Sequence, residues 1–165
     1  MNVQQEVPTT AEAWVALIRV RELVVDRLDA ALRREFDISF AEHDILVQLT
    51  VTGGTLQMGE IARALVISKS GVTRLVGKLE EQGLVERVTY PQNRRATFAT
   101  LTEDGRKLLE RAHPVYLEVL DEIFASPLST EDTTGLHRAL GKVLDAQGWS
   151  PPSPCAEWAR QPATT

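Results

Sequence analysis

Cysteine is nearly absent from this sequence, and so are the marks of a secreted or membrane protein. The single cysteine, Cys155, has no second thiol with which to form an internal disulfide, which favours a reducing compartment. No apolar run approaches the roughly 20 residues that cross a bilayer, and the stretch MNVQQEVPTTAEAW lacks the basic and apolar blocks of a signal peptide. We therefore expect a cytoplasmic protein with no membrane partner.

Enzyme signatures are missing as well. The chain has no glycine-rich phosphate loop, no H-E-x-x-H pattern and no nucleophile elbow. The paired carboxylates Glu80 and Glu81 fall on a predicted helix surface, where solvation explains them. We therefore expect no catalytic activity and no cofactor.

The sequence also lacks a general excess of positive charge. It carries 18 Lys and Arg against 23 Asp and Glu, a net charge of −5, which argues against a surface that coats nucleic acid everywhere. Residues 57–99 differ from the rest, with seven basic and four acidic residues, whereas residues 1–56 hold five and nine and residues 100–165 hold six and ten. A basic middle between acidic ends predicts one local polyanion-binding face.

Hydrophobic periodicity predicts a mainly helical chain that forms one ordinary domain. Capping boxes at Thr9–Glu12 and Ser39–Glu42 open the first two helices. Ser68 and Thr102 can cap the fourth and fifth, and Gly83 ends the fourth. The six helices are expected at about residues 10–35, 40–52, 58–65, 69–82, 103–125 and 129–147.

Two β-prone runs, LVERVT and ATFATL, follow the fourth helix and are joined by YPQNRR. They predict a two-stranded hairpin. A short helix, a tight turn, a second helix and a hairpin follow one another in the order of a winged helix-turn-helix.

The second helix of this motif has two chemically different faces. Its inward stripe consists of Val72, Leu75, Val76 and Leu79. Its start and outward face carry small donors and cations: Ser68, Lys69, Ser70, Thr73, Arg74 and Lys78. Such a helix can enter the major groove of duplex DNA and donate to base edges and phosphates, and its N-terminus suits phosphate. Arg94 and Arg95 at the hairpin tip can reach a narrow minor groove.

The stretch MGEIARALVISKSGVTRLVGKLEEQGLVERV, with the later NRRATFATLTEDG, resembles the core of the MarR family of multiple-antibiotic-resistance regulators. The resemblance covers about residues 10–147. It implies a homodimer of winged-helix subunits that binds a palindromic operator in double-stranded DNA as a repressor. It also implies release by a small-molecule effector, with aromatic compounds as one candidate class.

The same resemblance divides the chain into four parts. It implies an N-terminal dimerisation helix over residues 1–36 and a winged-helix lobe over residues 37–101. C-terminal dimerisation helices follow over residues 102–147, and the proline-rich residues 148–165 are expected to form a flexible tail.

The predicted hairpin, which is the wing of the winged helix-turn-helix, departs from the family pattern at one position. The family usually has aspartate two places before the wing arginine, and here Asn93 stands there. By that match Arg95 is the residue that enters the minor groove, and Arg94 reaches phosphate or solvent. Asn93 cannot form the ion pair that would aim Arg95.

Some side chains could sense a signal. The resemblance implies a pocket between the dimer helices and the DNA-binding lobe, and its candidate lining residues are Trp14, Ile18, Phe40, His43 and His113. A metal- or redox-gated regulator of the same fold would use His43, Asp44 and His113, or Cys155. Two histidines and one acid form a thin ligand set, so we expect no metal. A protein-binding winged-helix module is a further alternative, but it would expose apolar residues on the helix after Ser68, where none is found.

Overall fold

One long helix, α1 (Thr10–Phe36), begins the fold in the computed structural model, which describes residues 8–89 and 96–149. The predicted capping box opens it, because the Thr9 hydroxyl accepts from the Glu12 amide and the Glu12 carboxylate accepts from the Thr9 amide. Asp37 ends the helix with a left-handed φ of 54°, a conformation that aspartate adopts more readily than most residues.

A small lobe follows α1. Its elements are α2 (Phe40–Val51), β1 (Thr55–Gln57), α3 (Met58–Ala64), α4 (Lys69–Glu81), β2 (Val85–Thr89) and β3 (Thr97–Leu101). The Ser39–Glu42 capping box opens α2, and the Ser68 hydroxyl caps α4. Gly83, with a φ of 72°, turns the chain out of α4. These caps and ends are where the sequence predicts them.

The sheet has one strand more than the predicted hairpin. Strands β2 and β3 pair antiparallel, with Val85 opposite Leu101, and β1 adds to the other edge of β3, with Thr55 opposite Thr100. The order is therefore β1-β3-β2. The prediction of two strands was incomplete, because three residues are too few to show an alternating pattern.

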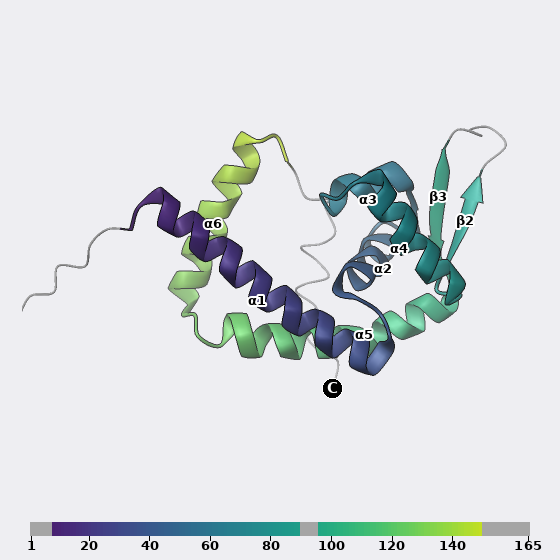
Figure 1. The fold of residues 1–165 in the computed structure, drawn as a ribbon, viewed down its shortest axis with the longest axis horizontal. Helices are drawn as coiled ribbons and strands as arrows, with labels where there is room; N and C mark the ends of the chain where they lie inside the picture. Colours follow the sequence, from purple (N-terminus) through teal and green to yellow (C-terminus); the bar gives the residue numbers. More distant parts are fainter. Residues whose placement is uncertain (1–7, 90–95, 150–165) are drawn as a thin grey trace, which may run out of the picture.

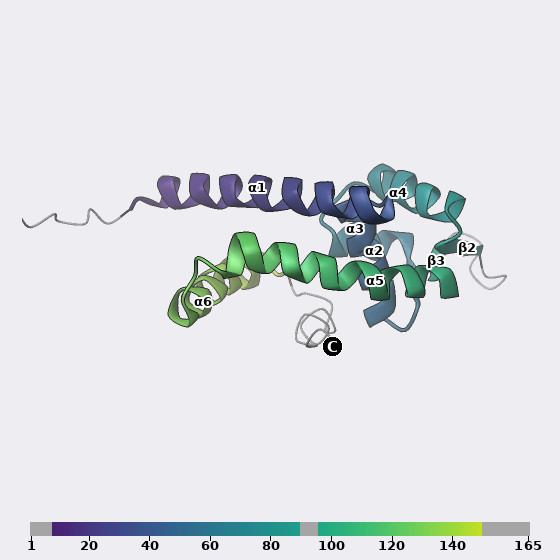
Figure 2. The same cartoon turned by 90° about the horizontal axis from the view of Figure 1, so that it is seen from below.

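The second half of the chain is helical. Helix α5 (Glu103–Leu120) passes into a π-helical turn, η2 (Asp121–Ala125), and α6 (Thr130–Ala146) follows. Figure 2 shows α5 running back along α1, with which it is in contact, and α6 on the other side of α5 from α1, at the end opposite the lobe. No helix in the described residues is long and apolar enough to span a membrane.

The core lies in the lobe. The predicted inward stripe of α4, residues 72, 75, 76 and 79, is buried there. It packs with Ile45, Leu46 and Leu49 of α2 and with the strands. Helix α1 contributes Leu32 and α5 contributes Leu109, so both long helices are anchored in the lobe by one end.

The other end of the molecule exposes apolar side chains. In α1 no residue before Leu28 is buried, and α6 has no buried residue. Trp14 and Leu23 on α1 are 59% and 64% exposed, and Val143 on α6 is 60% exposed. Within one chain, these helices leave large apolar surface in contact with solvent.

Gly105 fixes the start of α5 against the strands. The Thr102 hydroxyl accepts from the Gly105 amide and donates to the carbonyl of Gly83. A Cβ at Gly105 would lie 2.1 Å from the carbonyl oxygen of Leu84 and 2.8 Å from a Leu101 methyl. Only glycine allows this approach of helix to backbone.

We expect Gly105→Ala to lower the free energy of unfolding by about 1–3 kcal/mol, because the backbone of Leu84 must move to admit the methyl group. Gly135→Ala in α6 is the matched control. Nothing lies within 4 Å of a Cβ there, so alanine should be neutral or add about 0.5–1 kcal/mol through helix propensity. Urea unfolding of both variants measures this, and equal effects would show that the close approach is unimportant.

Candidate nucleic-acid interface

The turn between α3 and α4 sets the angle between the two helices. Val66 has a φ of 54°, and the amide of Ile67 donates to the carbonyl of Ala62, which is the Schellman arrangement that usually has glycine at the left-handed position. For valine this conformation costs about 1–2 kcal/mol. The Val66 side chain is 76% exposed, so the turn holds it without a compensating buried contact.

The predicted DNA-reading residues at the start of α4 share one exposed face. Ser68, Lys69, Ser70, Thr73 and Arg74 are all exposed, and the first turn of α4 has no acidic residue. The Ser68 hydroxyl accepts from the Gly71 amide, and the Thr73 hydroxyl donates to the Lys69 carbonyl. Within the described part of the chain, Lys69 and Arg74 form no ion pair. The start of α4 thus presents two cations, Lys69 and Arg74, that have no ion pair in the described residues and that lie next to short polar side chains.

Lys78, the sixth residue of the predicted set, is placed differently. Its ammonium lies 3.2 Å from Oε2 of Glu42 and donates to the carbonyl of Asp37 at 3.3 Å. The pattern of outward positions predicts a cation facing DNA, whereas the structure shows a cation already bound to a buried carboxylate.

Strand β2 of the wing is linked to α4 by Glu80 and Arg87. Glu80 accepts from the Arg87 backbone amide at 3.3 Å and pairs with its guanidinium at 3.2 Å. A Cβ at Gly77 would lie 2.8 Å from that guanidinium, so glycine leaves room for it on α4. Glu80 therefore ties β2 to the helix, and solvation alone was the wrong explanation for it. Arg94, Arg95 and Asn93 lie outside the described residues.

Of the five predicted pocket residues, the structure brings three together in a ring cluster: Phe40 and His43 of α2 with His113 and Tyr116 of α5. The His43 ring lies 4.8 Å from Tyr116 and 6.0 Å from His113, and Phe40 lies 6.3 Å from Tyr116. Tyr116 was missed, although it follows His113 by three residues and so shares its helix face.

Trp14 and Ile18 are not part of this ring cluster within one chain. The Phe40 amide donates to Asp29 of α1, which places the cluster near that level of the helix. At 1.5 Å per residue, Trp14 lies about 22 Å and Ile18 about 16 Å further along α1. One chain therefore does not form the five-residue pocket that was predicted.

Burial controls the ionisation of the ring cluster. It lowers the pKa of His43 to about 3, with a smaller contribution from His113, and lowers that of His113 to about 4. Burial also raises the pKa of the neighbouring Asp44 carboxyl and, together with the charge of Asp44, that of the Tyr116 phenol. Both histidines are neutral at pH 7, and Nε2 of His43 is buried without a hydrogen-bond partner in the described residues.

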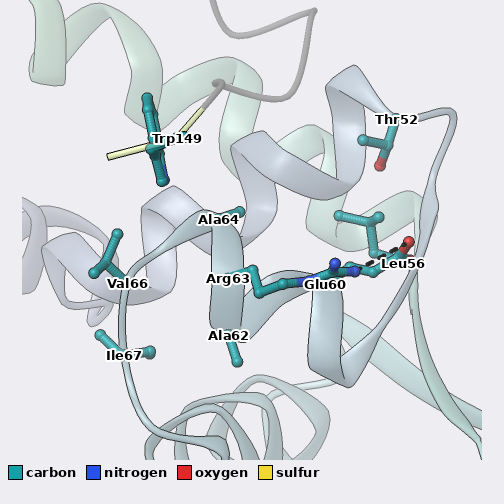
Figure 3. Close-up of a pocket in the computed structure, with 10 residues that line it drawn as sticks. Thr52, Leu56, Glu60, Ala62, Arg63, Ala64, Val66, Ile67 and Trp149 are labelled. Atoms are coloured by element: carbon teal, nitrogen blue, oxygen red, sulfur yellow. Dashed lines mark ion pairs between the residues drawn. The ribbon is translucent and has the colours of Figure 1, made fainter. Parts of the chain in front are cut away.

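A separate hollow of about 910 Å³ lies beside α3, and none of the five predicted pocket residues lines it. Its walls include Val66 and Ile67 of the turn and Trp149 after α6. Figure 3 shows the Trp149 ring standing beside the end of α3, with Arg63 reaching towards Glu60 along the opposite wall. Gly148, with a φ of 66°, ends α6 and turns the chain there.

The sequence of this chain is similar to those of known regulators. The family model described as MarR family matches residues 36–96. An HTH-type transcriptional regulator of Bacillus cereus, uncharacterized by name, is 30% identical over 130 residues, which are 79% of this chain and 85% of the relative. This chain belongs to the MarR family.

Two solved MarR structures from Streptomyces coelicolor have the same fold. AbsC is 28% identical with a TM-score of 0.76 and covers 87% of this chain and 98% of its own. Sco3205, solved in complex with DNA, is 28% identical with a TM-score of 0.77 and covers 92% of this chain and 95% of its own.

Membership of the MarR family confirms the predicted winged helix-turn-helix and makes the chain a DNA-binding transcriptional regulator. The relatives are regulators and not enzymes, as the sequence predicts. Among residues 8–89 and 96–149, no group of three His, Cys, Asp or Glu side chains is placed to hold a metal ion. Cys155 lies outside these residues.

The buried histidines should make the protein sensitive to acid. The pKa of His43 is about 3 in the folded chain against an ordinary value of 6.5, so the unfolded chain takes up the proton first as the pH falls. The contribution of a neutral, buried His43 to stability is therefore complete above about pH 6.5 and is lost progressively as the pH falls towards 3.

We expect His43→Phe, which keeps a ring at this position, to reduce the loss of unfolding free energy between about pH 7 and pH 4.5 by roughly 1–2 kcal/mol. Urea unfolding at both pH values measures the difference. An identical loss in the wild type and the variant would mean that other groups control acid unfolding.

Proposed function

We propose that this MarR protein is a homodimeric repressor that binds a palindromic operator and leaves it when a small molecule binds. The observation that carries the proposal is the start of α4. Lys69 and Arg74 are exposed, bear no ion pair in the described residues and flank Ser70 and Thr73 in the sequence. Short donors and free cations on one helix face suit major-groove edges and phosphates. Sco3205, a relative with this fold, was solved with DNA.

The wing extends the proposed contact. Glu80 and Arg87 hold β2 against α4, so the hairpin leaves the lobe at a fixed angle to α4, the proposed recognition helix. Arg95 in the minor groove and Arg94 on phosphate or solvent stay predictions from the sequence.

Arg74→Ala tests the DNA contact. We expect it to cost about 1–3 kcal/mol of binding free energy on the operator and much less on random DNA, if Arg74 meets a base edge. The control is Lys142→Ala, which removes one positive charge from α6 at the other end of the molecule (Figure 1). Fluorescence anisotropy with both DNA molecules gives the affinities, and equal losses on both would reassign Arg74 to phosphate.

The proposed homodimer rests on the surface that one chain leaves uncovered. The first two turns and the middle of α1 present Trp14, Val15, Val20 and Leu23 to solvent, and α6 presents Val143 and Leu144. A second copy that packs on α1 and α6 would cover these side chains, and the apolar area gained would drive the association.

Light scattering should give twice the chain mass of 18.3 kDa for the wild type at micromolar concentration. Leu23→Glu should shift the protein towards monomer, because the dimer would bury its carboxylate. The matched control is Val66→Glu, an exposed apolar residue of the lobe, which should stay dimeric. A monomeric wild type that binds the operator with full affinity would contradict the proposal.

The ring cluster is the proposed place of effector action. It joins α2 of the lobe to α5, and it contains a neutral His43 whose buried Nε2 lacks a hydrogen-bond partner in the described residues. A flat molecule with a complementary polar group could satisfy that atom and pack against Phe40 and Tyr116.

A further inference from the structure

The end of α4 is joined to the corner between α1 and α2 by three polar side chains. Lys78 Nζ binds Glu42 Oε2 at 3.2 Å and the Asp37 carbonyl at 3.3 Å. The same carbonyl accepts from Gln82 Nε2 at 3.1 Å. Glu42 Oε2 also accepts the Ser39 amide at 2.6 Å. One carboxylate thus holds both the start of α2 and the end of the recognition helix.

This arrangement opposes a direct role for Lys78 on DNA. The Glu42 side chain is only 3% exposed. If the ammonium of Lys78 left for a phosphate, it would leave a buried carboxylate without its cation, and removing one partner of a buried pair is strongly destabilising. Neither Lys69 nor Arg74 forms an ion pair with a buried acid in the described residues.

We propose that Lys78 is a positioning residue, which through Glu42 and Asp37 sets the angle of α4 relative to α1. The inference rests on the proposed function and adds its regulation. Because α1 carries the surface proposed for the dimer, the angle of α4 to α1 decides how the two recognition helices of a dimer are spaced.

The same turn of α2 also carries the rings. Phe40 lies two residues before Glu42 and His43 directly after it, and both rings stack on Tyr116 of α5. The Phe40 amide also donates to Asp29 of α1. A movement of these rings therefore moves the carboxylate that holds Lys78. This short path joins the ring cluster to the recognition helix.

Three variants test the proposal: Glu42→Gln, Lys78→Met and the double variant. Glutamine keeps the shape of Glu42 without its charge, and methionine keeps most of the stem of Lys78. Operator affinity is measured by fluorescence anisotropy over a range of salt concentrations. We expect each single variant to lose about tenfold in affinity, which is ~1.4 kcal/mol. The double variant should lose no more than either single variant, and the salt dependence should equal that of the wild type.

Direct contact of Lys78 with phosphate gives the opposite result. Glu42→Gln would then free the ammonium and leave affinity unchanged or higher. Lys78→Met would lower affinity in both backgrounds and reduce the slope of log affinity against log salt by about 0.9. Lys69→Met is the matched control and should show this salt effect. Either the phosphate pattern at Lys78 or unchanged affinity in all three variants would overturn the proposal.

Two further checks separate the possible failures. Circular dichroism melts show whether each variant folds. If Lys78→Met alone is unstable, Glu42→Gln and the double variant still test the proposal, because neither leaves an unpaired carboxylate in the protein interior. A wild-type protein that binds no operator would count against the proposed function. A wild type that binds, with the phosphate pattern at Lys78, would count against this inference alone.

Discussion

The carboxylate of Glu42 is buried, and it is stable there because it accepts from the Ser39 amide and pairs with Lys78. A buried charge is costly unless it is paired and hydrogen-bonded. The Ser39 bond is local to the start of α2, so the charge is paired only when the end of α4 brings Lys78 to that cap. With the end of α4 held there, Val72 and Val76 face the core, and Lys69 and Arg74 face outward.

Such a pair is better suited to fixing geometry than to adding stability. Well-packed apolar residues often replace buried ion pairs without loss, because desolvation offsets most of the attraction. Apolar contacts, however, are non-directional, and a helix held only by its apolar stripe can shift its angle at low cost. The directed bonds from Lys78 and Gln82 to Asp37 restrict that angle, which matters in a protein whose partner is a DNA groove.

The sequence predicts the features that depend on neighbours along the chain. The capping boxes at Thr9–Glu12 and Ser39–Glu42 and the buried stripe of α4 are all set by spacing within one or two helical turns. Features that join distant segments do not show in such spacing. Lys78 has the spacing of an outward residue, but its partner Glu42 is 36 residues away, and the pairing becomes visible only when α2 and α4 pack.

The candidate pocket shows the same limit. His43 and His113 were both chosen from the sequence, and the fold does bring them together. Trp14 was named with them as a candidate lining residue of the pocket that the resemblance implies. Only the last turns of α1 enter the lobe, and a rigid helix carries Trp14 away from it. One end of α1 thus packs into the lobe, and the rest leaves apolar side chains exposed. The position of a residue along α1 decides which of these surroundings it has.

A ligand in the ring cluster can regulate DNA binding only if it binds two arrangements of the α2 turn unequally. A tenfold preference needs about 1.4 kcal/mol, which is close to the net value of one buried hydrogen bond. The buried Nε2 of His43, with no partner in the described residues, offers a bond of that size. A ligand that completes it in only one position of the turn would therefore supply enough free energy to move Glu42, and with it the recognition helix.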